Sequence, residues 1–566
     1  MFARKKTRIA REIDPDEIFL DSSNLPGHEV AQFEGRVEHP VSKRAIFGVG
    51  AIFIAASLIF TGQAYQLQVQ NGDTYAQVSR DNRLSRTVLF APRGVIYDRN
   101  GTELAWNEVI ANESTTTDVT LYARRAYTSL PGLAHTVGFV RYPKMDTSGR
   151  WWREEYVGIS GSELAFDAHL AGQNGSKMAE ANARGEVQRE HIVVLPTPGK
   201  NVELSIDADV QSKLHTTLLG HANTHGFRGG ASVIMDVTTG EILALVSVPE
   251  YDNAAFAEGE TDVIRTTHLS ERLPALNRAI AGAYTPGSIV KPFFAAAALQ
   301  EGIISPEKEI ESTGTLVVPN PYYPDKPSVF RDWKAHGWTD MRDALSVSSD
   351  IYFYTIGGGF ASQAGLGILR LSEYARRFGF GAPADFVLWG EVAGVVPTPE
   401  WKEKIFGPDD PWRIGDTYNT AIGQYGMQVT PLQAVRAIAT IANDGLLVTP
   451  ILTVGEKTKS IPLGISRGNL VVVREGMRRA VAGSGGTASA LAMPRFFIAA
   501  KTGTAQTGAR NEWMNSWVVG FWPYENPRFA FATLLEHAPA GTLAGASPAM
   551  RPFFEWLAAN KMEYIE

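Results

Sequence analysis

Residues 281–300 read AGAYTPGSIVKPFFAAAALQ, and within them Ser288 and Lys291 stand three positions apart. A proline and a glycine directly before the serine interrupt any regular element, whereas the alanine-rich second half of the stretch favours a helix. Pro292 is tolerated only near the start of a helix, so the predicted helix begins close to Ser288. Residues three apart on a helix share a face, and the serine and the lysine are therefore expected to lie side by side.

A serine and a lysine in this arrangement suit nucleophilic catalysis. A serine hydroxyl is a poor nucleophile until a base takes its proton, and a neutral lysine amine can do that. Lysine becomes neutral near neutral pH only when burial or a neighbouring cation lowers its pKa. The helix N-terminus also supplies backbone N–H groups for a developing oxyanion. We therefore expect Ser288 to be the nucleophile and Lys291 its base.

Two further short motifs follow along the chain. The first is Ser348-Ser349-Asp350 within SVSSDIYFY, and the second is Lys501-Thr502-Gly503-Thr504 after the apolar run FFIAA. That run predicts a strand, so the second motif is expected to line a cleft. The glycine in it would let a substrate backbone approach closely.

The side chains of these motifs complement the serine and the lysine. Lys501 is a second cation, able to lower the pKa of Lys291 and to attract a substrate carboxylate. Thr502 and Thr504 offer hydroxyl groups to that carboxylate, and Ser348 could relay a proton between the lysines. Each motif alone is a weak signal, but three in this order and in suitable predicted elements are specific.

Other candidate sites are weaker. Gly464-Ile-Ser466-Arg-Gly468 matches the nucleophile elbow G-x-S-x-G, but no apolar strand leads into it. Ser466 is better interpreted as the N-cap of the next helix. His336 belongs to no metal-ligand pattern, and the 11 histidines form no H-E-x-x-H or H-x-H pair. We therefore predict neither a metal nor a cofactor.

The composition excludes several classes of protein. The 566 residues carry a formal net charge of -7, which does not suggest a nucleic-acid partner. The chain contains no cysteine, so disulfides, thiolate nucleophiles and cysteine metal sites are ruled out.

An apolar run at residues 45–64 contains no charged residue and has the length of about 20 residues that spans a bilayer as a helix. Lys43 and Arg44 precede the run, whereas the first basic residue after it is Arg80. This asymmetry predicts a cytoplasmic N-terminus and an extracytoplasmic C-terminal part. A cleaved signal peptide and a buried core helix are the alternatives. The first is disfavoured because 44 residues precede the run, and the second because the run lacks a polar face.

The rest of the chain predicts three further parts. Residues 1–44 are expected to form a cytoplasmic tail, 65–200 an elongated and mostly β module, and 201–566 the catalytic domain. In the last part we expect an α/β (α+β) arrangement with an antiparallel sheet faced by helices. Its predicted elements are a helix at 207–225, a hairpin of strands 230–237 and 241–248, strands at 495–500 and 528–535, and a helix at 548–561.

Several stretches resemble signatures of one family, the class B penicillin-binding proteins. Beside the three motifs, the resemblance rests on Pro92–Gly101 (PRGVIYDRNG), Asn277-Arg278-Ala279 leading into Tyr284–Ser288, Gly423-Gln424 with Thr430–Gln433, and Lys501–Gln506. It extends from the apolar run to the C-terminus. It implies the penicillin-binding and serine β-lactamase-like transpeptidase fold, standing on a pedestal formed by residues 65–200.

The resemblance also implies a reaction. Ser288 would be acylated by a stem peptide ending in D-Ala-D-Ala, with Lys291 as base and Ser348 passing the proton to the leaving group. Lys501, Thr502 and Thr504 would bind the donor, with Gly503 beside them. The backbone N–H groups of Ser288 and Thr504 would form the oxyanion hole. β-Lactams would acylate the same serine.

The resemblance further implies a bacterial inner-membrane protein and a partner. Its catalytic domain would lie outside the cytoplasm, and the pedestal would dock a polytopic glycosyltransferase of the shape, elongation, division and sporulation class (SEDS). Aromatic residues in the pedestal fit either such a surface or a small core of its own. They include Phe139, Trp151, Trp152 and Tyr156.

Asp350 stands where many relatives have asparagine, and this departure resembles the elongation branch, penicillin-binding protein 2. We expect Asp350 to bind the substrate, although an ionised aspartate accepts but does not donate hydrogen bonds, which puts an amide-type contact in question. The alternatives are a septal transpeptidase of the same class and a penicillin-binding sensor without turnover. A β-lactamase would need a deacylating glutamate after Asp350, and Glu373 lies in an unsuitable context.

Overall fold

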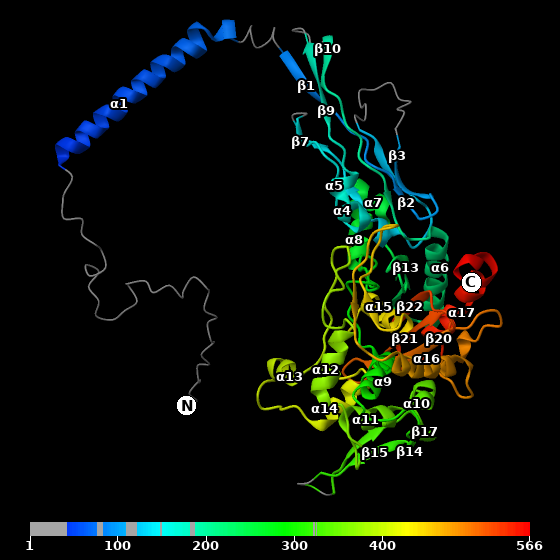
Figure 1. The fold of residues 1–566 in the computed structure, drawn as a ribbon. Helices are drawn as coiled ribbons and strands as arrows, with labels where there is room; N and C mark the ends of the chain where they lie inside the picture. The colour runs from blue at the N-terminus through cyan, green and yellow to red at the C-terminus, as the bar shows by residue number, and fades with distance from the viewer. Residues whose placement is uncertain are drawn as a thin grey trace, which may run out of the picture. The chain divides into compact units, whose positions relative to one another are not determined.

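The computed structural model describes most of the chain (Figure 1). The described residues are 42–75, 83–108, 122–147, 150–181, 187–320, 323 and 325–565. Most of the tail predicted at residues 1–44 therefore lies outside the described residues. By its internal contacts the chain divides into two compact units. The first comprises Met1–Ser85 and Ala179–Glu190, and the second comprises Arg86–Met178 and His191–Glu566.

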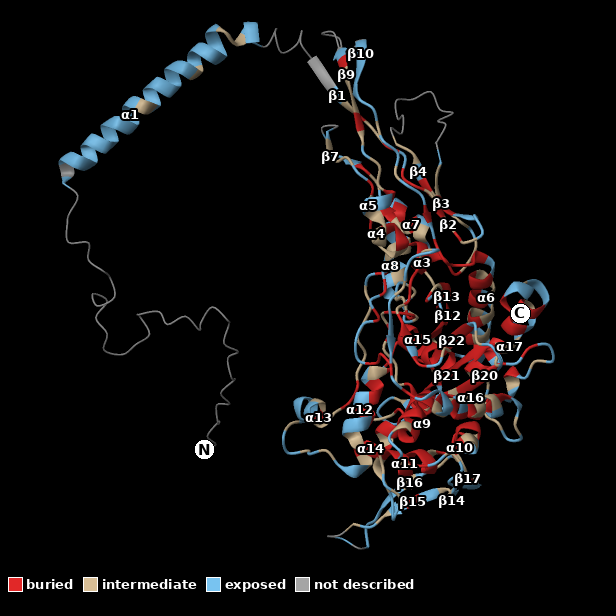
Figure 2. Ribbon diagram, viewed as in Figure 1, coloured by how far each residue is buried: buried red, intermediate tan, exposed pale blue. Residues whose placement is uncertain are grey.

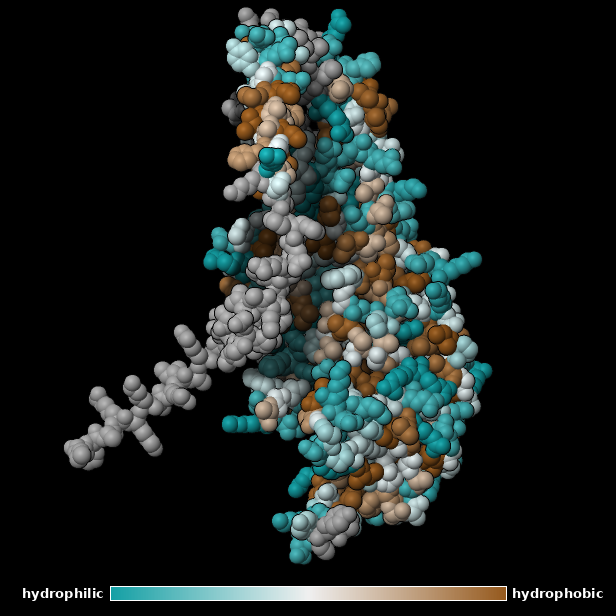
Figure 3. Space-filling model, turned by 90° about the vertical axis from the view of Figure 1, so that its left-hand side faces the viewer, coloured by the Kyte–Doolittle hydropathy of each residue, from teal (hydrophilic) through white to brown (hydrophobic). Residues whose placement is uncertain are grey.

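The predicted membrane segment is a helix. Helix α1 (Lys43–Tyr65) continues into a π-helical turn, Gln66–Gln70, so the helical stretch is longer than predicted. Ser42 caps it by accepting a hydrogen bond from Ala45 N at 3.2 Å. The span Arg44–Gln70 is long and apolar enough to cross a membrane, and none of it is buried, which contradicts the buried-core alternative. Its large apolar side chains are exposed, and Figure 3 shows such hydrophobic residues on the surface in brown.

The second unit contains a five-stranded antiparallel sheet with the order β13-β12-β22-β21-β20. Its strands are β12 (Gly229–Asp236), β13 (Ile242–Val248), β20 (Ala499–Thr507), β21 (Trp513–Trp522) and β22 (Phe529–Pro539). The predicted hairpin is confirmed, with Asp236 Oδ1 accepting from the N–H groups of Thr238 and Thr239 in the turn. The strand expected at 495–500 begins only at Ala499, and strand β21 was not predicted at all.

Helices cover both faces of this sheet (Figures 1 and 2). Helices α6 (Ala208–His225) and α17 (Ala546–Asn560) pack against the face that contains Ile234 and Phe531. Helices α9 (Lys291–Gln300) and α15 (Pro431–Ala442) pack against the opposite face. Successive strand residues alternate between the two faces, so each strand contributes to both cores. The predicted α/β arrangement is therefore confirmed.

Two predicted helix caps are confirmed as well. Asp207 Oδ1 accepts from Val210 N at 3.0 Å and begins α6. Ser466 Oγ accepts from Asn469 N at 3.2 Å and begins α16 (Arg467–Ala482). Ser466 is therefore a helix cap, as expected, and not the nucleophile of an elbow.

The other α-helices described in the second unit have between 4 and 11 residues. They are α3 (Ala134–Val137), α4 (Gly161–Ala165), α5 (Asp167–Leu170), α7 (Asn253–Glu258), α8 (Thr261–Leu269), α10 (Met341–Val347), α11 (Asp350–Gly358), α12 (Gly367–Arg377), α13 (Pro399–Phe406) and α14 (Ile414–Ala421). Two-stranded sheets form from β14 (Ile310–Ser312) with β17 (Gly337–Thr339), β15 (Thr315–Val318) with β16 (Ser328–Arg331), and β18 (Leu446–Val448) with β19 (Ser460–Pro462).

From residue 83 onward, the described residues of the stretch predicted as the pedestal form strands and very short helices. A four-stranded sheet has the order β11-β2-β3-β4, from β11 (Val202–Glu203), β2 (Ile96–Tyr97), β3 (Glu103–Glu108) and β4 (Arg124–Tyr127). A three-stranded sheet has the order β1-β9-β10, from β1 (Arg83–Leu89), β9 (Gly175–Ala181) and β10 (Val187–Val194). The short pairs are β5 (Val140–Arg141) with β8 (Val157–Gly158), and β6 (Lys144–Met145) with β7 (Trp151–Arg153).

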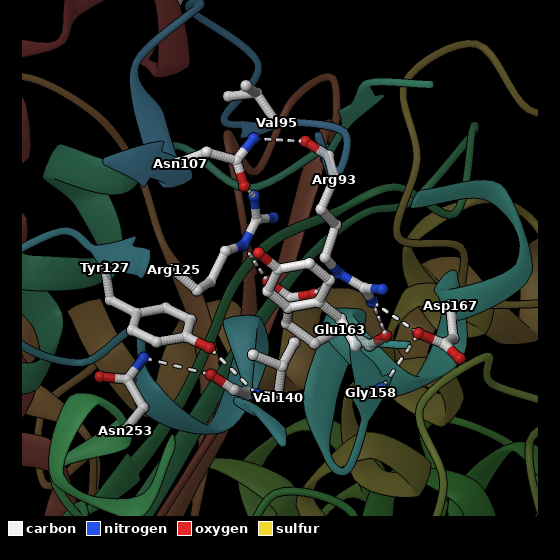
Figure 4. A network of polar contacts seen from close by, with 12 residues as sticks. Arg93, Val95, Asn107, Arg125, Tyr127, Val140, Gly158, Glu163, Asp167 and Asn253 are labelled. Carbon is white, nitrogen blue, oxygen red and sulfur yellow. Dashed lines mark hydrogen bonds and ion pairs between the residues drawn. The ribbon is translucent and has the colours of Figure 1, made fainter. Parts of the chain in front are cut away.

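A buried ionic network connects strands and helices of this stretch (Figure 4). The two oxygens of Glu163 contact Arg93 Nε at 2.6 Å and Arg125 Nε at 2.7 Å, and all three side chains are fully buried. Arg93 also contacts Asp167 at 2.7 Å. Arg93 belongs to the signature at 92–101, so this part of the resemblance has a structural explanation.

Candidate active site

Ser288 lies on a tight turn directly before a helix. It belongs to the 3₁₀ turn Gly287–Val290, and the α-helix α9 begins at Lys291. The prediction of a helix start close to Ser288 is confirmed, although the serine itself precedes the α-helix. Gly287 has a positive φ of 56°, and a Cβ there would lie 2.8 Å from Thr504 O. A glycine is therefore needed for the turn to approach strand β20.

The third motif lies within strand β20, opposite this turn. A Cβ on Gly503 would lie 2.8 Å from Pro286 O and from the side chain of Ile289. The missing side chain of Gly503 therefore accommodates the serine turn, whereas the sequence suggested close approach of a substrate. Trp517 on the neighbouring strand β21 donates from Nε1 to Thr285 O at 3.0 Å. The sheet thus supports Ser288 from two strands.

Other family signatures also support the turn. Gly287 N donates to Gly423 O at 3.0 Å. Gly423 has a positive φ of 77°, and a Cβ there would collide with Gly287 O, which explains a glycine at position 423. Tyr284 and Val429 exchange two backbone hydrogen bonds of 2.9 Å. Arg278 is fully buried and contacts Glu536 Oε1 through Nε at 2.7 Å. These residues position the backbone around Ser288.

Ser348 lies between the two lysines. Its Oγ is 2.7 Å from Lys501 Nζ and 3.3 Å from Lys291 Nζ, and both lysines are fully buried. Lys291 Nζ also donates to Ser348 O at 2.8 Å, and Lys501 Nζ donates to Thr502 O at 2.8 Å. The structure therefore brings three predicted site residues, distant in sequence, into direct contact. This is the geometry that a proton relay requires.

Asp350 contacts Lys291, which the sequence analysis did not predict. Its Oδ1 lies 2.6 Å from Lys291 Nζ, and its side chain is 18% exposed. With Ser348 O and Oγ, this carboxylate uses all three donors of the Lys291 ammonium group. Position 350 therefore faces the base as well as the open cleft.

Burial lowers the pKa of Lys501 far below its ordinary value. The positive charge of Lys291 lowers the same pKa further, and the carboxylate of Asp350 opposes both effects. From the sequence we predict that Lys501 lowers the pKa of Lys291, and this stays a prediction. Lys501 is itself fully buried, and its hydrogen-bond partners among the described residues include no carboxylate, so its charged form is disfavoured.

Two cavities of about 480 Å³ each meet at Ser288. Both are lined by Ser288, Trp333, Asp350 and Thr504. The first, which we name the threonine-side cavity, is further lined by Thr487, Thr502, Gly503, Ser516 and Ser547. The second, which we name the amide-side cavity, is further lined by Arg331, Tyr354, Asn419, Gln424, Gln506 and Asn511.

Several lining residues were missed by the sequence analysis. Thr487 accepts from Thr502 Oγ1 at 2.9 Å and so belongs to the threonine-side cavity. Trp333 contributes to both cavities. Both stand outside the three motifs, in stretches without a recognisable pattern, so only the folded chain assigns them to the site. His336 lies next to the site, with Nε2 3.4 Å from Asp332 Oδ1.

Sequence models of two domain families match the chain. The penicillin-binding protein transpeptidase domain matches residues 230–555, and the penicillin-binding protein dimerisation domain matches residues 109–204. The first match covers more than half of the 566 residues. The chain belongs to the penicillin-binding protein transpeptidase family. Its fold class is the one predicted, and the N-terminal apolar helix accompanies it.

Relatives and solved structures are similar over most of the chain. The peptidoglycan D,D-transpeptidase MrdA of Haemophilus influenzae is 29% identical, over 96% of each chain. Penicillin-binding protein 2 of Helicobacter pylori, solved in complex with MreC, has a TM-score of 0.70 at 25% identity, over 85% of this chain and 100% of that chain. A chain of a peptidoglycan synthase complex has a TM-score of 0.69 at 27% identity, over 91% and 97%. The predicted class B penicillin-binding protein, most like penicillin-binding protein 2, is confirmed.

Proposed function

We propose that this chain is a peptidoglycan D,D-transpeptidase of the elongation type, which joins stem peptides through an acyl-enzyme on Ser288. The observation that supports it best is the position of Ser288, where two cavities meet beside two buried lysines that share the hydroxyl of Ser348. A relative of similar length is named as a peptidoglycan D,D-transpeptidase.

In the first half of the proposed reaction, Ser288 Oγ attacks the carbonyl carbon of the penultimate D-alanine. Lys291 takes the hydroxyl proton, which requires it to give up one of its present hydrogen bonds. The backbone N–H groups of Ser288 and Thr504 stabilise the oxyanion. The C–N bond then breaks, and the terminal D-alanine leaves with a proton delivered through Ser348.

In the second half, an amine of another stem peptide attacks the ester on Ser288. A new C–N bond forms, the ester C–O bond breaks, and the proton of the amine returns to the serine through the same groups. The leaving amine and the incoming amine approach the carbonyl from the same side, because the second half reverses the first. One cavity therefore serves both amines in turn, and the other keeps the acyl chain.

We assign the threonine-side cavity to the terminal D-alanine and then to the acceptor. Lys501 contacts Ser348, which lines this cavity, and Thr487, Thr502 and Ser547 offer hydroxyl groups to a carboxylate. The amide-side cavity would hold the rest of the donor peptide. Its side-chain amides of Asn419, Gln424 and Gln506 suit a peptide backbone.

We further propose the orientation and the domain arrangement in the cell. Basic residues before the apolar segment place the N-terminus in the cytoplasm. Residues 45–64 then cross the inner membrane, 65–200 form the pedestal, and 201–566 form the catalytic domain outside. Protease added to intact spheroplasts should remove the outer part and leave a small membrane-bound fragment. Survival of the outer part under these conditions would contradict this orientation.

A polytopic glycosyltransferase of the SEDS class is the proposed partner. Solved structures of similar chains support a role in cell-wall assemblies: one is in complex with MreC, and another belongs to a complex that coordinates polymerization and crosslinking. The partner would supply the glycan strands whose stem peptides this chain joins.

The decisive experiment is mass spectrometry of the full chain in detergent after reaction with a labelled penicillin. We expect one covalent adduct on Ser288 that is released slowly. Lys291→Ala should acylate at least about 10²-fold more slowly, the usual contribution of a positioned base. The exposed residue Lys308, changed to alanine, is the control and should react normally. An adduct on another residue, or rapid release of the drug, would contradict the proposal.

A further inference from the structure

Ser348 adopts a backbone conformation that is rare for a residue with a side chain. Its φ of 60° and ψ of 41° lie in the left-handed region, where it ends helix α10 and directly precedes the N-cap of α11. Residues other than glycine keep such a conformation only when the surrounding structure over-determines it. The position of Ser348 Oγ between the two lysines depends on this conformation, so the contacts that maintain it matter for the chemistry.

Asp332 makes contacts on the C-terminal side of Ser348. Its carboxylate is fully buried, and Oδ2 accepts from Ser349 Oγ at 2.9 Å and from Ile351 N at 3.1 Å. Ser312 Oγ donates to the same oxygen at 3.1 Å. Asp332 therefore binds the first turn of α11, the helix that begins with Asp350.

Trp333 makes the contact on the N-terminal side. Its indole Nε1 donates to Val347 O at 3.2 Å, directly before Ser348. Its backbone N–H donates to Asp332 Oδ1 at 2.9 Å, which joins the two contacts into one unit. The Trp333 side chain remains 57% exposed and lines both cavities. The indole N–H thus points toward the backbone of Val347, while much of the ring faces the cleft.

We propose that Asp332 and Trp333 are positioning residues of the reaction, which hold Ser348 in its left-handed conformation between Lys291 and Lys501. Trp333 binds the chain before Ser348, at Val347 O. Asp332 binds the chain after Ser348, at the hydroxyl group of Ser349 and at Ile351 N. This inference rests on the proposed function, since it concerns the rate at which Ser288 is acylated.

The chemistry of Asp332 explains why a carboxylate is needed there. Its two oxygens accept four hydrogen bonds, from two hydroxyl groups and two backbone N–H groups. On the Oδ1 side the Nε2 atom of His336 also lies 3.4 Å away. An asparagine has nearly the same shape, but its NH₂ group would face donors whichever way it turned. Asp332→Asn therefore disrupts these hydrogen bonds with little change in the volume of the side chain.

The test compares this change with a buried cap elsewhere. Asp207 is the matched control, because it is a buried helix cap whose carboxylate accepts from Val210 N, Asn100, Tyr564 and the ammonium group of Lys561, away from the site. Trp333→Phe removes the indole donor and keeps an aromatic wall, and exposed Trp338→Phe is its control. For each variant of the full chain in detergent, stopped-flow acylation by a fluorescent penicillin gives the binding constant and the acylation rate constant separately, and calorimetry gives Tm.

We expect Asp332→Asn and Trp333→Phe to lower the acylation rate constant by about 10-fold or more, with little change in the binding constant. Asp207→Asn should lower Tm without changing the rate constant, and Trp338→Phe should change neither. A merely structural role of Asp332 would instead make it behave like Asp207. Should Asp332→Asn fail to fold, Trp333→Phe decides alone, and an unchanged rate constant in it would overturn the proposal.

A double-mutant cycle tests whether the pair acts through Ser348. In a Ser348→Ala background, Asp332 and Trp333 have no hydroxyl group to position. Adding Asp332→Asn should therefore slow acylation less than twofold further. Equal losses in both backgrounds would overturn the proposal. The proposed function fails separately: then wild-type chain would not be acylated at Ser288 at all, whereas a failure of this inference leaves wild-type acylation intact.

Discussion

Two buried lysines share one serine hydroxyl in this site, and their surroundings differ. Lys291 contacts the carboxylate of Asp350, whereas Lys501 has only neutral oxygens among its hydrogen-bond partners. The pKa of Lys501 is lowered by its burial and by the charge of Lys291. Lys501 is therefore suited to accept a proton from Ser348. The charge of Asp350 acts on Lys501 through space and raises its pKa.

This arrangement predicts a pH effect of Asp350→Asn. A relay that shares the proton taken by Lys291 with Lys501 through Ser348 needs a neutral Lys501, so acylation declines as the pH falls through the pKa of that lysine. Asp350 raises this pKa, so removing its charge should lower it further. We expect the acid limb of the acylation rate constant, measured as a function of pH, to move to lower pH.

The control for this prediction is Asp343→Asn. Asp343 is a half-exposed carboxylate on the neighbouring helix α10 and contacts Arg479 at 2.7 Å instead of a site lysine. Its removal should leave the acid limb in place. A shift of the limb to higher pH in Asp350→Asn would show that Asp350 does not act on Lys501 as described.

The sequence identified the groups that carry the chemistry but not how they pair. Ser288, Lys291, Ser348 and Lys501 were recognised because each lies in a short motif with a chemical reason. The contact of Asp350 with Lys291 was not, because 59 positions separate them and a side-chain distance cannot be read from composition or spacing. Asp332 and Thr487 were missed for the same reason.

At the scale of elements, an uninterrupted β-rich run decided which strands could be predicted. The hairpin of β12 and β13 was recognised from two β-rich runs around a Thr-Thr-Gly turn, although both strands are buried on both faces. Strand β21 is equally buried but was missed, because Asn515, Ser516 and Gly520 interrupt its run of residues that favour strands. The apolar residues 496–498 were assigned to a strand, but the carbonyl groups of Phe497 and Ile498 accept from Tyr524 N and Arg478 instead.

The serine turn and strand β20 depend on a close approach, which predicts the effect of Gly287→Ala. The added Cβ would meet Thr504 O, and alanine disfavours the positive φ of the turn. We expect the turn to move away from β20, with a lower Tm and an acylation rate constant lowered by about 10-fold or more.

Gly302→Ala separates these two causes. Gly302 also has a positive φ, 63°, but nothing lies within 4 Å of a Cβ placed there. It should therefore lower Tm through backbone strain alone and leave acylation unchanged. Equal acylation rates in both variants would mean that the approach to β20 does not position Ser288.

The ionic network around Glu163 predicts a large loss of stability. One buried carboxylate contacts two buried guanidinium groups (Figure 4). Glu163→Gln therefore removes the negative charge that Arg93 and Arg125 share. Breaking a buried pair in this way costs about 3 kcal/mol or more. We expect a decrease of that size in the free energy of unfolding, measured with urea.

Glu154→Gln is the matched control. Glu154 contacts Arg86 at 3.7 Å on the surface, and both side chains are at least a third exposed. Such a pair contributes less than about 1 kcal/mol. If Glu163→Gln were no more destabilising than this control, the buried network would not contribute to the stability of the fold.

At the scale of the whole molecule, the aromatic residues of the pedestal divide by exposure. Tyr156 is buried, and its ring packs edge-to-face against Tyr122, with centroids 6.0 Å apart. Phe139 packs against Phe256 of helix α7, at 5.4 Å between centroids, and so joins the pedestal to the predicted catalytic domain. Trp152, in contrast, is 61% exposed. The sequence suggested either a small core or a docking surface, and these residues indicate that the pedestal has a core and also leaves apolar side chains on its surface.

Four consecutive exposed apolar residues, Ile192, Val193, Val194 and Leu195, stand at the end of strand β10. A contiguous exposed apolar patch of this kind marks a surface for a partner. We therefore expect Trp152→Ala and Val193→Glu to weaken co-purification with a SEDS-class glycosyltransferase and to slow growth of the cell wall. Penicillin acylation of Ser288 should remain at the wild-type rate, because neither residue touches the catalytic sheet or its cavities.

Tyr156→Ala distinguishes docking from folding. It removes a buried ring and its hydrogen bond to Ala123 O, so it should lower Tm. Any loss of partner binding in it would follow from that instability. The docking role requires a different pattern in the exposed variants: partner binding lost, Tm unchanged and acylation unchanged. Should Trp152→Ala and Val193→Glu lose binding only together with Tm or acylation, the exposed surface of the pedestal would have no docking role separate from its fold.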